Sequence, residues 1–368
     1  MLYHLLFPLA DQHILFNVFQ YISFRAAGAM VTALLTAFLV GPGVISRLRR
    51  HRIGQVVRAD GPATHLKKAG TPTMGGLIIL AACLVPTLLW ARLDNTYVWI
   101  AFGVTAWMGA IGFMDDYLKI VRHHSRGLIA RYKLIWQFVL GLALGGFLLW
   151  QPTSAYGATQ TMLPFFKDLT VVLAPAVFPL FVAVVVAGTA NTVNLTDGLD
   201  GLATGLAAIA ALTFGAFAYA IGRVDTSAYL GLLYLNGAGE LSVFCAALAG
   251  AAIGFLWFNA HPADVIMGDT GSLALGGAIG AVAVLLKSEF LLLIVGGVFV
   301  LEGLSVMAQI GWFKFSRWRW GEGRRLLRMA PLHHHFEKLG WPEPRVVTRF
   351  YILGIIFALV GLATLKIR

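Results

Sequence analysis

Four amide and carboxylate side chains lie close together in segment 187–205, whose sequence is AGTANTVNLTDGLDGLATG. They are Asn191, Asn194, Asp197 and Asp200. The two asparagines are three residues apart, as are the two aspartates, so each pair shares one face of a helix. Long apolar runs flank the segment, and polar groups at membrane depth are costly unless they line a cavity or bind a ligand. This stripe therefore favours contacts with a sugar, a base or a diphosphate, and a hydrogen-bonded break in a membrane helix is the alternative.

Three further carboxylates are candidate metal ligands. Asp115 and Asp116 are adjacent at the end of an apolar run, and a site that holds two neighbouring ionised carboxylates usually contains a cation. Asp269 stands between two glycines in MGDTGS, just before another apolar run. A tight turn can hold a metal ligand there, and a helix N-cap is the alternative. Carboxylates beside a diphosphate are the usual protein ligands of Mg²⁺.

Two other segments could hold negative charge. Lys68 precedes the turn AGTPTMGG, which contains Thr73. An ammonium group beside the backbone N–H groups of such a turn can bind an anion, although a basic membrane anchor followed by a turn is the alternative. His333, His334 and His335 are consecutive. Neighbours on a helix point about 100° apart, so phosphate or sugar contacts are favoured over a zinc site.

The apolar run 290–312 contains two polar residues, Glu302 and Gln309. A buried acid inside a membrane helix is functional or paired by default. For Glu302, support of the site and a structural pair both remain open. Gln309 is closer to the basic end of the run and could border the site.

The elements that must position these side chains are apolar runs of membrane-spanning length. The chain has 368 residues, of which 58% are hydrophobic and 12% charged. Since a spanning helix needs roughly 20 apolar residues, these runs predict an all-α polytopic membrane protein, folded as a single domain over residues 1–368. The ten runs are 22–45, 74–90, 98–114, 134–150, 169–187, 199–221, 241–258, 271–286, 290–312 and 347–365. Segment 1–20 is broken by Pro8 and Asp11 and predicts an interfacial lead-in helix.

The distribution of charge predicts how the spans are oriented. Most of the 28 lysines and arginines lie in segments 46–73, 115–133 and 313–346, which share one side when ten spans are counted. By the positive-inside rule this side is the cytoplasm, and both termini are outside. The net charge of +11 is thereby explained without nucleic acid. All the polar clusters fall on this cytoplasmic side. Cys83 and Cys245 lie in apolar runs and predict buried small side chains.

Five motifs together resemble the phospho-N-acetylmuramoyl-pentapeptide-transferase family, from about residue 54 to the C-terminus and in the family's order. They are KAGTPTMGG, DDYLK, NTVNLTDGLDGLATG, NAHPADVIMGDTGSLALGG and MAPLHHHFEKLGWPEPRV. The acidic motifs are shared with N-acetylglucosamine-1-phosphate transferases of the wider superfamily. The last motif points to the muramoyl branch.

The resemblance implies a Mg²⁺-dependent transfer in the bacterial cytoplasmic membrane. Phospho-MurNAc-pentapeptide would pass from UDP-MurNAc-pentapeptide to undecaprenyl phosphate, with release of UMP, in peptidoglycan biosynthesis. Asp116 and Asp269 would hold Mg²⁺, and Asp115 would assist the lipid phosphate. Direct attack and a route through an aspartyl-phosphate both fit, and direct attack is favoured because the nucleophile is already an anion.

The resemblance also assigns the remaining contacts. Lys68, Lys133 and His333–His335 would offset negative charge. Uridine or sugar groups would contact Thr73, Asn191, Asn194, Asp197, Asp200, Asn259, Gly268 and Gln309. One position departs from the family pattern, because Ile266 stands where an aromatic residue would stack on the uracil.

Two rival functions are weighed against this one. A transporter of an anionic lipid or nucleotide sugar would place its site at the bilayer midplane between repeated halves. No repeat is visible in the sequence and the acids gather on one side, which favours the transferase. Within enzymes, UDP-GlcNAc:polyprenyl-phosphate transfer is the alternative. Association of two copies through apolar faces stays open, because no residue selects a face.

Overall fold

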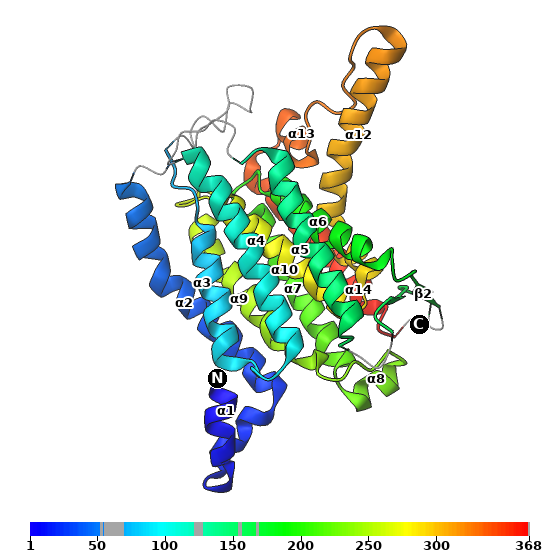
Figure 1. Cartoon of the computed structure of the whole chain (residues 1–368). Coiled ribbons are helices and arrows are strands. Elements are labelled where there is room, and N and C mark those ends of the chain that lie inside the picture. Colours follow the sequence, from blue (N-terminus) through cyan, green and yellow to red (C-terminus); the bar gives the residue numbers. More distant parts are fainter. Residues whose placement is uncertain (52–53, 55–69, 121–127, 154–156, 167–168, 367–368) are drawn as a thin grey trace.

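The computed structural model describes residues 1–51, 54, 70–120, 128–153, 157–166 and 169–366, and these are built almost entirely from helices (Figure 1). Within these residues, nine helices are long and apolar enough to cross a membrane, and a tenth, α3, is shorter. The ten are α2 (Ile22–Arg50), α3 (Gly76–Trp90), α4 (Thr96–Ile120), α5 (Ala130–Trp150), α6 (Phe178–Thr196), α7 (Leu202–Ile221), α9 (Leu241–Asn259), α10 (Gly268–Leu285), α12 (Gly297–Trp320) and α14 (Glu343–Ala363). The predicted all-α polytopic architecture is confirmed.

Short elements connect the long helices. They are α1 (Leu2–Leu6), η1 (Phe7–Asp11), η2 (Ile14–Gln20), β1 (Gln160–Met162), β2 (Thr170–Val172), α8 (Val224–Leu230), η4 (Ala238–Glu240), α11 (Glu289–Val295) and α13 (Leu332–Lys338). The two strands pair antiparallel, with Gln160 opposite Val172. The lead-in expected as one helix consists of the three short pieces α1, η1 and η2.

Two predicted spans have different boundaries in the structure. The run 169–187 begins with strand β2, and α6 starts only at Phe178, with a proline in its first turn. Proline fits the first turn of a helix because its missing N–H is not needed there. The run 290–312 is divided at Gly296 into α11 and α12. Helix α12 continues to Trp320, with Arg317 and Arg319 in its last turn.

Helix α10 lies at the centre of the bundle. Every residue from Thr270 to Leu285 is buried, and the helix packs against α3, α4, α6 and α7. Nearby, α2 and α9 approach closely through small residues. A Cβ added at Gly250 would lie 2.5 Å from the backbone oxygen of Met30. Small residues allow such close approach between membrane helices.

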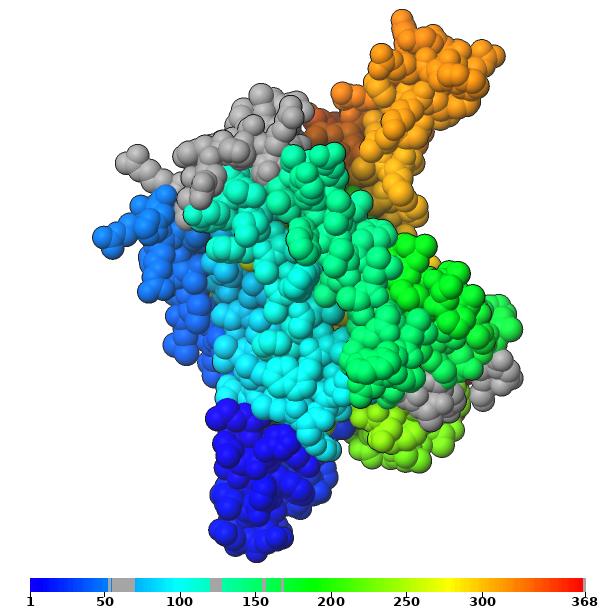
Figure 2. Space-filling model, viewed as in Figure 1, coloured from blue at the N-terminus to red at the C-terminus, as the bar shows by residue number. Residues whose placement is uncertain are grey.

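The bundle has two distinct ends (Figure 1). The N-terminal helix α1 lies at one end and α13 lies at the other. The last part of α12 and the residues after it protrude from the rest of the molecule, as the orange segment in Figure 2 shows. The α13 end carries the polar clusters described next. Which end faces the cytoplasm stays a prediction from the charge distribution.

Candidate active site

Two glycines bring the start of α10 against its neighbours. A Cβ at Gly112 of α4 would lie 2.1 Å from the Asp269 backbone oxygen, and a Cβ at Gly76 of α3 would lie 2.1 Å from the Gly271 nitrogen. Gly268 has φ +73°, a conformation that side chains with a Cβ rarely adopt. A Cβ there would also lie 2.7 Å from Asp116 Oδ2. The first turn of α10 is thus fitted closely to α3 and α4.

Asp116 of α4 caps this turn from outside the helix. Its Oδ1 accepts a hydrogen bond from the Asp269 N–H (3.2 Å), and its Oδ2 accepts from the Thr270 N–H (2.9 Å) and hydroxyl (2.7 Å). The helix's own N-cap residue, Met267, supplies no side-chain hydrogen bond. The alternative interpretation of Asp269 as the N-cap is therefore wrong, because Asp116 accepts the hydrogen bonds from the first N–H groups of α10.

Asp115 and Asp269 share two lysines. Asp269 Oδ2 lies 2.6 Å from Lys133 Nζ and 3.3 Å from Lys119 Nζ. Asp115 pairs with Lys119 through Oδ2, which is also 4.0 Å from Lys133 Nζ. Its Oδ1 accepts from the Leu128 N–H at 2.8 Å. The structure therefore brings three carboxylates and two ammonium groups together.

The acidic triad, Asp115, Asp116 and Asp269, could hold a metal ion. One ligand oxygen from each residue lies within 4.8 Å of the others, and Asp115 and Asp116 are almost fully buried. A donor set made only of carboxylate oxygens suits a hard cation such as Mg²⁺. A carboxylate oxygen has two lone pairs, and Asp116 Oδ1 uses one of them for the hydrogen bond from the Asp269 N–H. The residues present therefore fit a divalent cation.

The two asparagines of α6 have different partners. Asn194 Nδ2 donates to Asp269 Oδ1 and to Ser272 Oγ, both at 2.8 Å. Asn191 Nδ2 donates to Gln137 Oε1 of α5 at 2.6 Å and to a backbone oxygen of its own helix. Only Asn194 of this pair is hydrogen-bonded to the acidic triad.

The turn between α6 and α7, residues 197–201, is termed the polar turn. Asp197 lies half-buried at its start. Asp200 is buried, and its Oδ2 is 3.1 Å from His261 Nδ1 and accepts from the Ala263 N–H at 3.2 Å. The Asp200 N–H donates to Glu343 Oε1 at 2.7 Å. These contacts fasten the turn both to residues 261–263 of the loop before α10 and to the start of α14.

Asn259 fastens the same turn to the loop before α10. Its Oδ1 accepts from the Gly201 N–H and the Thr204 hydroxyl, both at 3.1 Å, and its Nδ2 donates to the Val265 oxygen at 2.9 Å. Further along this loop, Ile266 pairs through its backbone with residues 72 and 75. This pairing places Thr73, which is buried, beside the Gly268 turn.

The three histidines of α13 have different surroundings, as their spacing predicts. His333 is fully buried, whereas His334 and His335 are partly buried. His334 Nδ1 lies 2.7 Å from Glu337 Oε2, and His335 Nδ1 accepts from the Arg328 N–H at 3.1 Å. Gln309 contacts the backbone of residues 326 and 327. Lys68 lies outside the described residues.

Several residues of the site were not singled out from the sequence. Lys119 had a signal, because it follows Asp115 by four residues on one helix and so lies on the same face. Thr270 and Ser272 lie beside Asp269 in the sequence, but their partners come from other helices. Glu343 and His261 had no local signal, since both contact Asp200 only through the fold.

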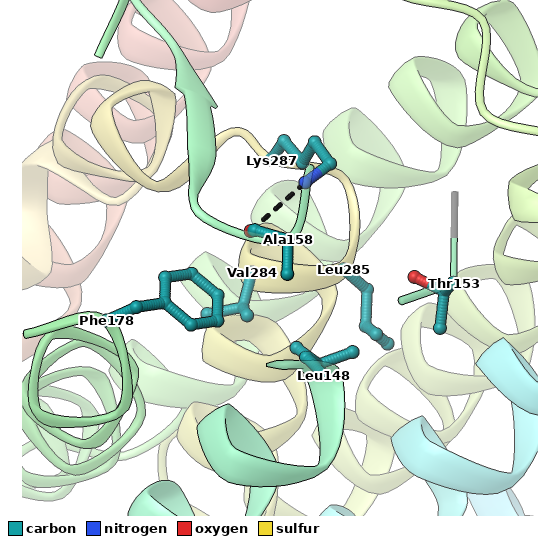
Figure 3. Close-up of a pocket in the computed structure, with 7 residues that line it drawn as sticks. All are labelled: Leu148, Thr153, Ala158, Phe178, Val284, Leu285 and Lys287. Carbon is teal, nitrogen blue, oxygen red and sulfur yellow. Dashed lines mark hydrogen bonds between the residues drawn. The ribbon is translucent and has the colours of Figure 1, made fainter. Parts of the chain in front are cut away.

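A small cavity lies at the far end of α10 (Figure 3). Its volume is about 10 Å³, which is about the space of one water molecule. Lys287 lines it and donates to the Ala158 backbone oxygen at 3.2 Å. The 18 residues of α10 separate this cavity from the acidic triad by about 27 Å. It is therefore too small and too distant to be the substrate site.

Comparisons with known proteins identify the class first. A family model described as glycosyl transferase family 4 matches residues 98–287, which include the acidic triad and the polar turn. The chain is thus of the glycosyl transferase family 4 class, and its helices are long and apolar enough to lie in a membrane. A second match, described as phospho-N-acetylmuramoyl-pentapeptide-transferase signature 1, covers residues 68–80.

Relatives over the full length define the family more narrowly. The chain is 58% identical over 380 residues to a phospho-N-acetylmuramoyl-pentapeptide-transferase of Gemmatimonas aurantiaca, and 51% identical over 368 residues to one of Citrifermentans bemidjiense. A protein of the same name from Geobacter sp. is 52% identical over 368 residues. Each alignment covers 100% of both chains. The chain belongs to the phospho-N-acetylmuramoyl-pentapeptide-transferase family, and it is a multi-pass protein of the bacterial inner membrane.

Proposed function

We propose that this chain transfers phospho-MurNAc-pentapeptide from UDP-MurNAc-pentapeptide to undecaprenyl phosphate, giving lipid I and UMP in peptidoglycan biosynthesis. The observation that carries the proposal is the convergence of the acidic triad with Lys133 and Asn194 at one end of the helices. It occurs in a chain whose full-length relatives bear the name of this transferase. Phosphoryl transfer needs alignment and charge neutralisation more than covalent assistance, and this site is equipped for both.

The reaction is a direct displacement at phosphorus. An oxygen of undecaprenyl phosphate forms a bond to the phosphorus that carries the sugar. The bond from that phosphorus to the oxygen bridging to UMP breaks, and UMP leaves with the electron pair. The second pKa of a phosphate monoester is about 6, so the nucleophile needs orientation more than deprotonation. Asp115 provides this orientation from the triad. Isolation of a protein phosphorylated at Asp115 or Asp116 would contradict direct attack.

The cation proposed for the triad is Mg²⁺, with Asp116 and Asp269 as its protein ligands. When bound there, Mg²⁺ supplies positive charge for the diphosphate and for the leaving UMP. Asn194 holds Asp269 Oδ1 through its amide, so the carboxylate keeps one orientation. Lys133, only slightly exposed, adds a fixed positive charge beside the same carboxylate.

The nucleotide sugar is proposed to lie along the polar turn and the loop before α10. Asp197 is half-buried at the edge of the turn, and Asn259 and Asp200 hold the turn in place. Asp200 and Asn259 are buried, so we propose that they act by holding the shape of the polar turn rather than by touching the nucleotide sugar. Lys68, Thr73 and His334 complete the proposed contacts with the substrates. The site is proposed to face the cytoplasm, where a soluble nucleotide sugar is available.

The proposal is tested by release of UMP from membranes that contain the protein. UDP-MurNAc-pentapeptide and UDP-GlcNAc are compared, each with undecaprenyl phosphate, with Mg²⁺ and with EDTA. We expect release from UDP-MurNAc-pentapeptide, abolished by EDTA. Release from UDP-GlcNAc alone would assign the chain to the N-acetylglucosamine branch, and release from neither would favour transport.

The metal assignment is tested with Asp269→Asn. This change keeps the side chain's size but removes the charge shared by Lys119, Lys133 and the cation. We expect UMP release to fall by roughly 100- to 1,000-fold, the range seen when one group that stabilises transition-state charge is removed. Asp225→Asn is the control, because Asp225 is exposed on α8 and forms a local ion pair with Arg223. Full activity of Asp269→Asn would remove Asp269 from the metal site.

A further inference from the structure

Glu302 of α12 caps a different helix. The residue has no exposed surface. Its Oε2 accepts a hydrogen bond from the Leu332 N–H at 2.8 Å, and its Oε1 accepts from the His333 N–H at 3.2 Å. The N-cap residue of α13 is Pro331, whose side chain has no acceptor. The first N–H groups of a helix need acceptors from outside it, and Glu302 supplies them to α13.

The same carboxylate also lies close to the ring of the first histidine of α13. His333 Nδ1 lies 3.2 Å from Glu302 Oε1, and neither side chain is exposed. On the other side of the ring, a Cβ added at Gly198 would lie 2.2 Å from His333 Nε2. His333 is therefore held between Glu302 and the polar turn. Its ring also contacts that of His334, with centroids 4.1 Å apart.

Glu302 is itself held in a fixed place beside α6. The next residue, Gly303, packs so closely on α6 that a Cβ would lie 2.7 Å from Thr192 Cγ2. Thr192 lies between Asn191 and Asn194 in the sequence. Two helical turns beyond Glu302, Gln309 Oε1 accepts from the N–H groups of residues 326 and 327. Helix α12 thus anchors the segment leading into α13 at two points, and Figure 1 shows the two helices side by side.

We propose that Glu302 is a positioning residue for the transfer reaction. By capping α13 it sets His333 against Gly198, and this contact fixes the spacing between His334 and the polar turn. The inference rests on the proposed placement of the reaction at the acidic triad. It also assigns His333 a role through packing, whereas the sequence predicted a direct charge contact. The residue must be a carboxylate, because both of its oxygens face backbone N–H groups.

The first test is Glu302→Gln. The amide keeps the size of the side chain but offers one acceptor to two backbone donors, so one buried N–H loses its partner. We expect α13 to shift, and displacements of about 1 Å near a reaction centre can cost roughly 100-fold. The kcat for UMP release should fall roughly 10- to 100-fold. The KM for UDP-MurNAc-pentapeptide should change less than about threefold, as for an interaction that matters mainly in the transition state.

Amide hydrogen exchange separates positioning from general loss of stability. Peptides covering 328–339 should exchange faster in Glu302→Gln, while those of α10 should not change. The matched control is Glu289→Gln, since Glu289 is also a buried acid, hydrogen-bonded to Thr161 at the opposite end of the protein. It should leave kcat unchanged. An equal loss of kcat in this control would overturn the proposal.

A second variant reaches the same contact from the other side. Gly198→Ala places a methyl group against His333 without altering Glu302, so it should also lower kcat with little change in KM. The two changes combined should cost less than the product of their separate effects, because both disturb one contact. Multiplicative effects, or wild-type kcat and exchange in Glu302→Gln, would refute the inference. Failure of the proposed site is distinguished by Asp269→Asn, which would then retain UMP release.

Discussion

Substitution of Gly268 tests whether activity depends on the close packing of the first turn of α10 against Asp116. Substitution by alanine has two separate costs. The first is conformational, because φ is +73° and the left-handed region costs a non-glycine residue roughly 1–2 kcal/mol. The second is steric. The new Cβ would lie 2.7 Å from Asp116 Oδ2, whereas ordinary contact begins at 3.4 Å, so the carboxylate or the turn must move by about 0.7 Å.

Such a movement disturbs a proposed metal ligand and the cap of α10 together. We expect Gly268→Ala to lower kcat/KM for UMP release roughly 10- to 100-fold, in line with the cost of displacements approaching 1 Å at a reaction centre. The apparent affinity for Mg²⁺, measured as the concentration that gives half-maximal activity, should weaken as well. Thermal unfolding in detergent should occur at a lower temperature.

Gly321→Ala is the matched control for the conformational cost. Gly321 follows α12 with φ +77°, and a Cβ there would meet nothing within 4 Å. This variant should therefore lose a similar amount of stability and keep its activity and Mg²⁺ dependence. The reasoning is refuted if Gly268→Ala has wild-type kcat/KM. It is also refuted if Gly321→Ala loses as much activity, because strain alone would then explain the effect.

Two further predictions concern charge. Lys133→Met removes the ammonium group 2.6 Å from Asp269 Oδ2. At the Mg²⁺ concentration that saturates the unmodified protein, kcat/KM for UMP release should fall at least roughly tenfold and stay low when Mg²⁺ is raised, because a fixed charge aimed at the diphosphate is lost. Full recovery at higher Mg²⁺ would instead mean that the lysine only occupies the position of the cation. Glu289 begins α11, outside the nine candidate spans, and burial raises the pKa of its carboxyl to about 7, against a partial lowering by the Thr161 hydroxyl. The pKa of Glu289 is higher in the folded than in the unfolded protein, so this group stabilises the fold below about pH 4.5 and the stabilisation is lost as the pH rises through 7. The melting temperature should therefore fall between pH 5 and 8. Glu289→Gln should make this fall smaller.

The acidic triad could be predicted because carboxylates are conspicuous in apolar surroundings. Asp115, Asp116 and Asp269 interrupt runs that otherwise favour lipid, and the cost of burying charge makes such positions informative. The spans were predictable for the same reason. Their ends were less so, because the division at Gly296 and the start of α6 depend on local backbone geometry and strand pairing.

The partners of the polar residues could not be predicted from one sequence. Glu302 lies 30 residues before the backbone that it caps, and Glu343 lies 143 residues after the N–H that it accepts from. Such contacts depend on how helices meet, whereas periodicity reports only which face of a helix is polar. For this reason the sequence left Glu302 open between two roles and gave no sign of Glu343.

The capping of α10 by Asp116 has a practical consequence for trapping the protein with its substrates bound. An inactive variant for structure determination should keep the resting geometry, yet Asp116 accepts hydrogen bonds from the Asp269 and Thr270 N–H groups as well as from a hydroxyl. Its replacement would loosen the first turn of α10 and so reduce the order of the site in the bound complex. The Asp269 side chain is held instead by the side chains of Asn194, Lys119 and Lys133. Asp269→Asn is therefore the better variant for capturing both substrates in place.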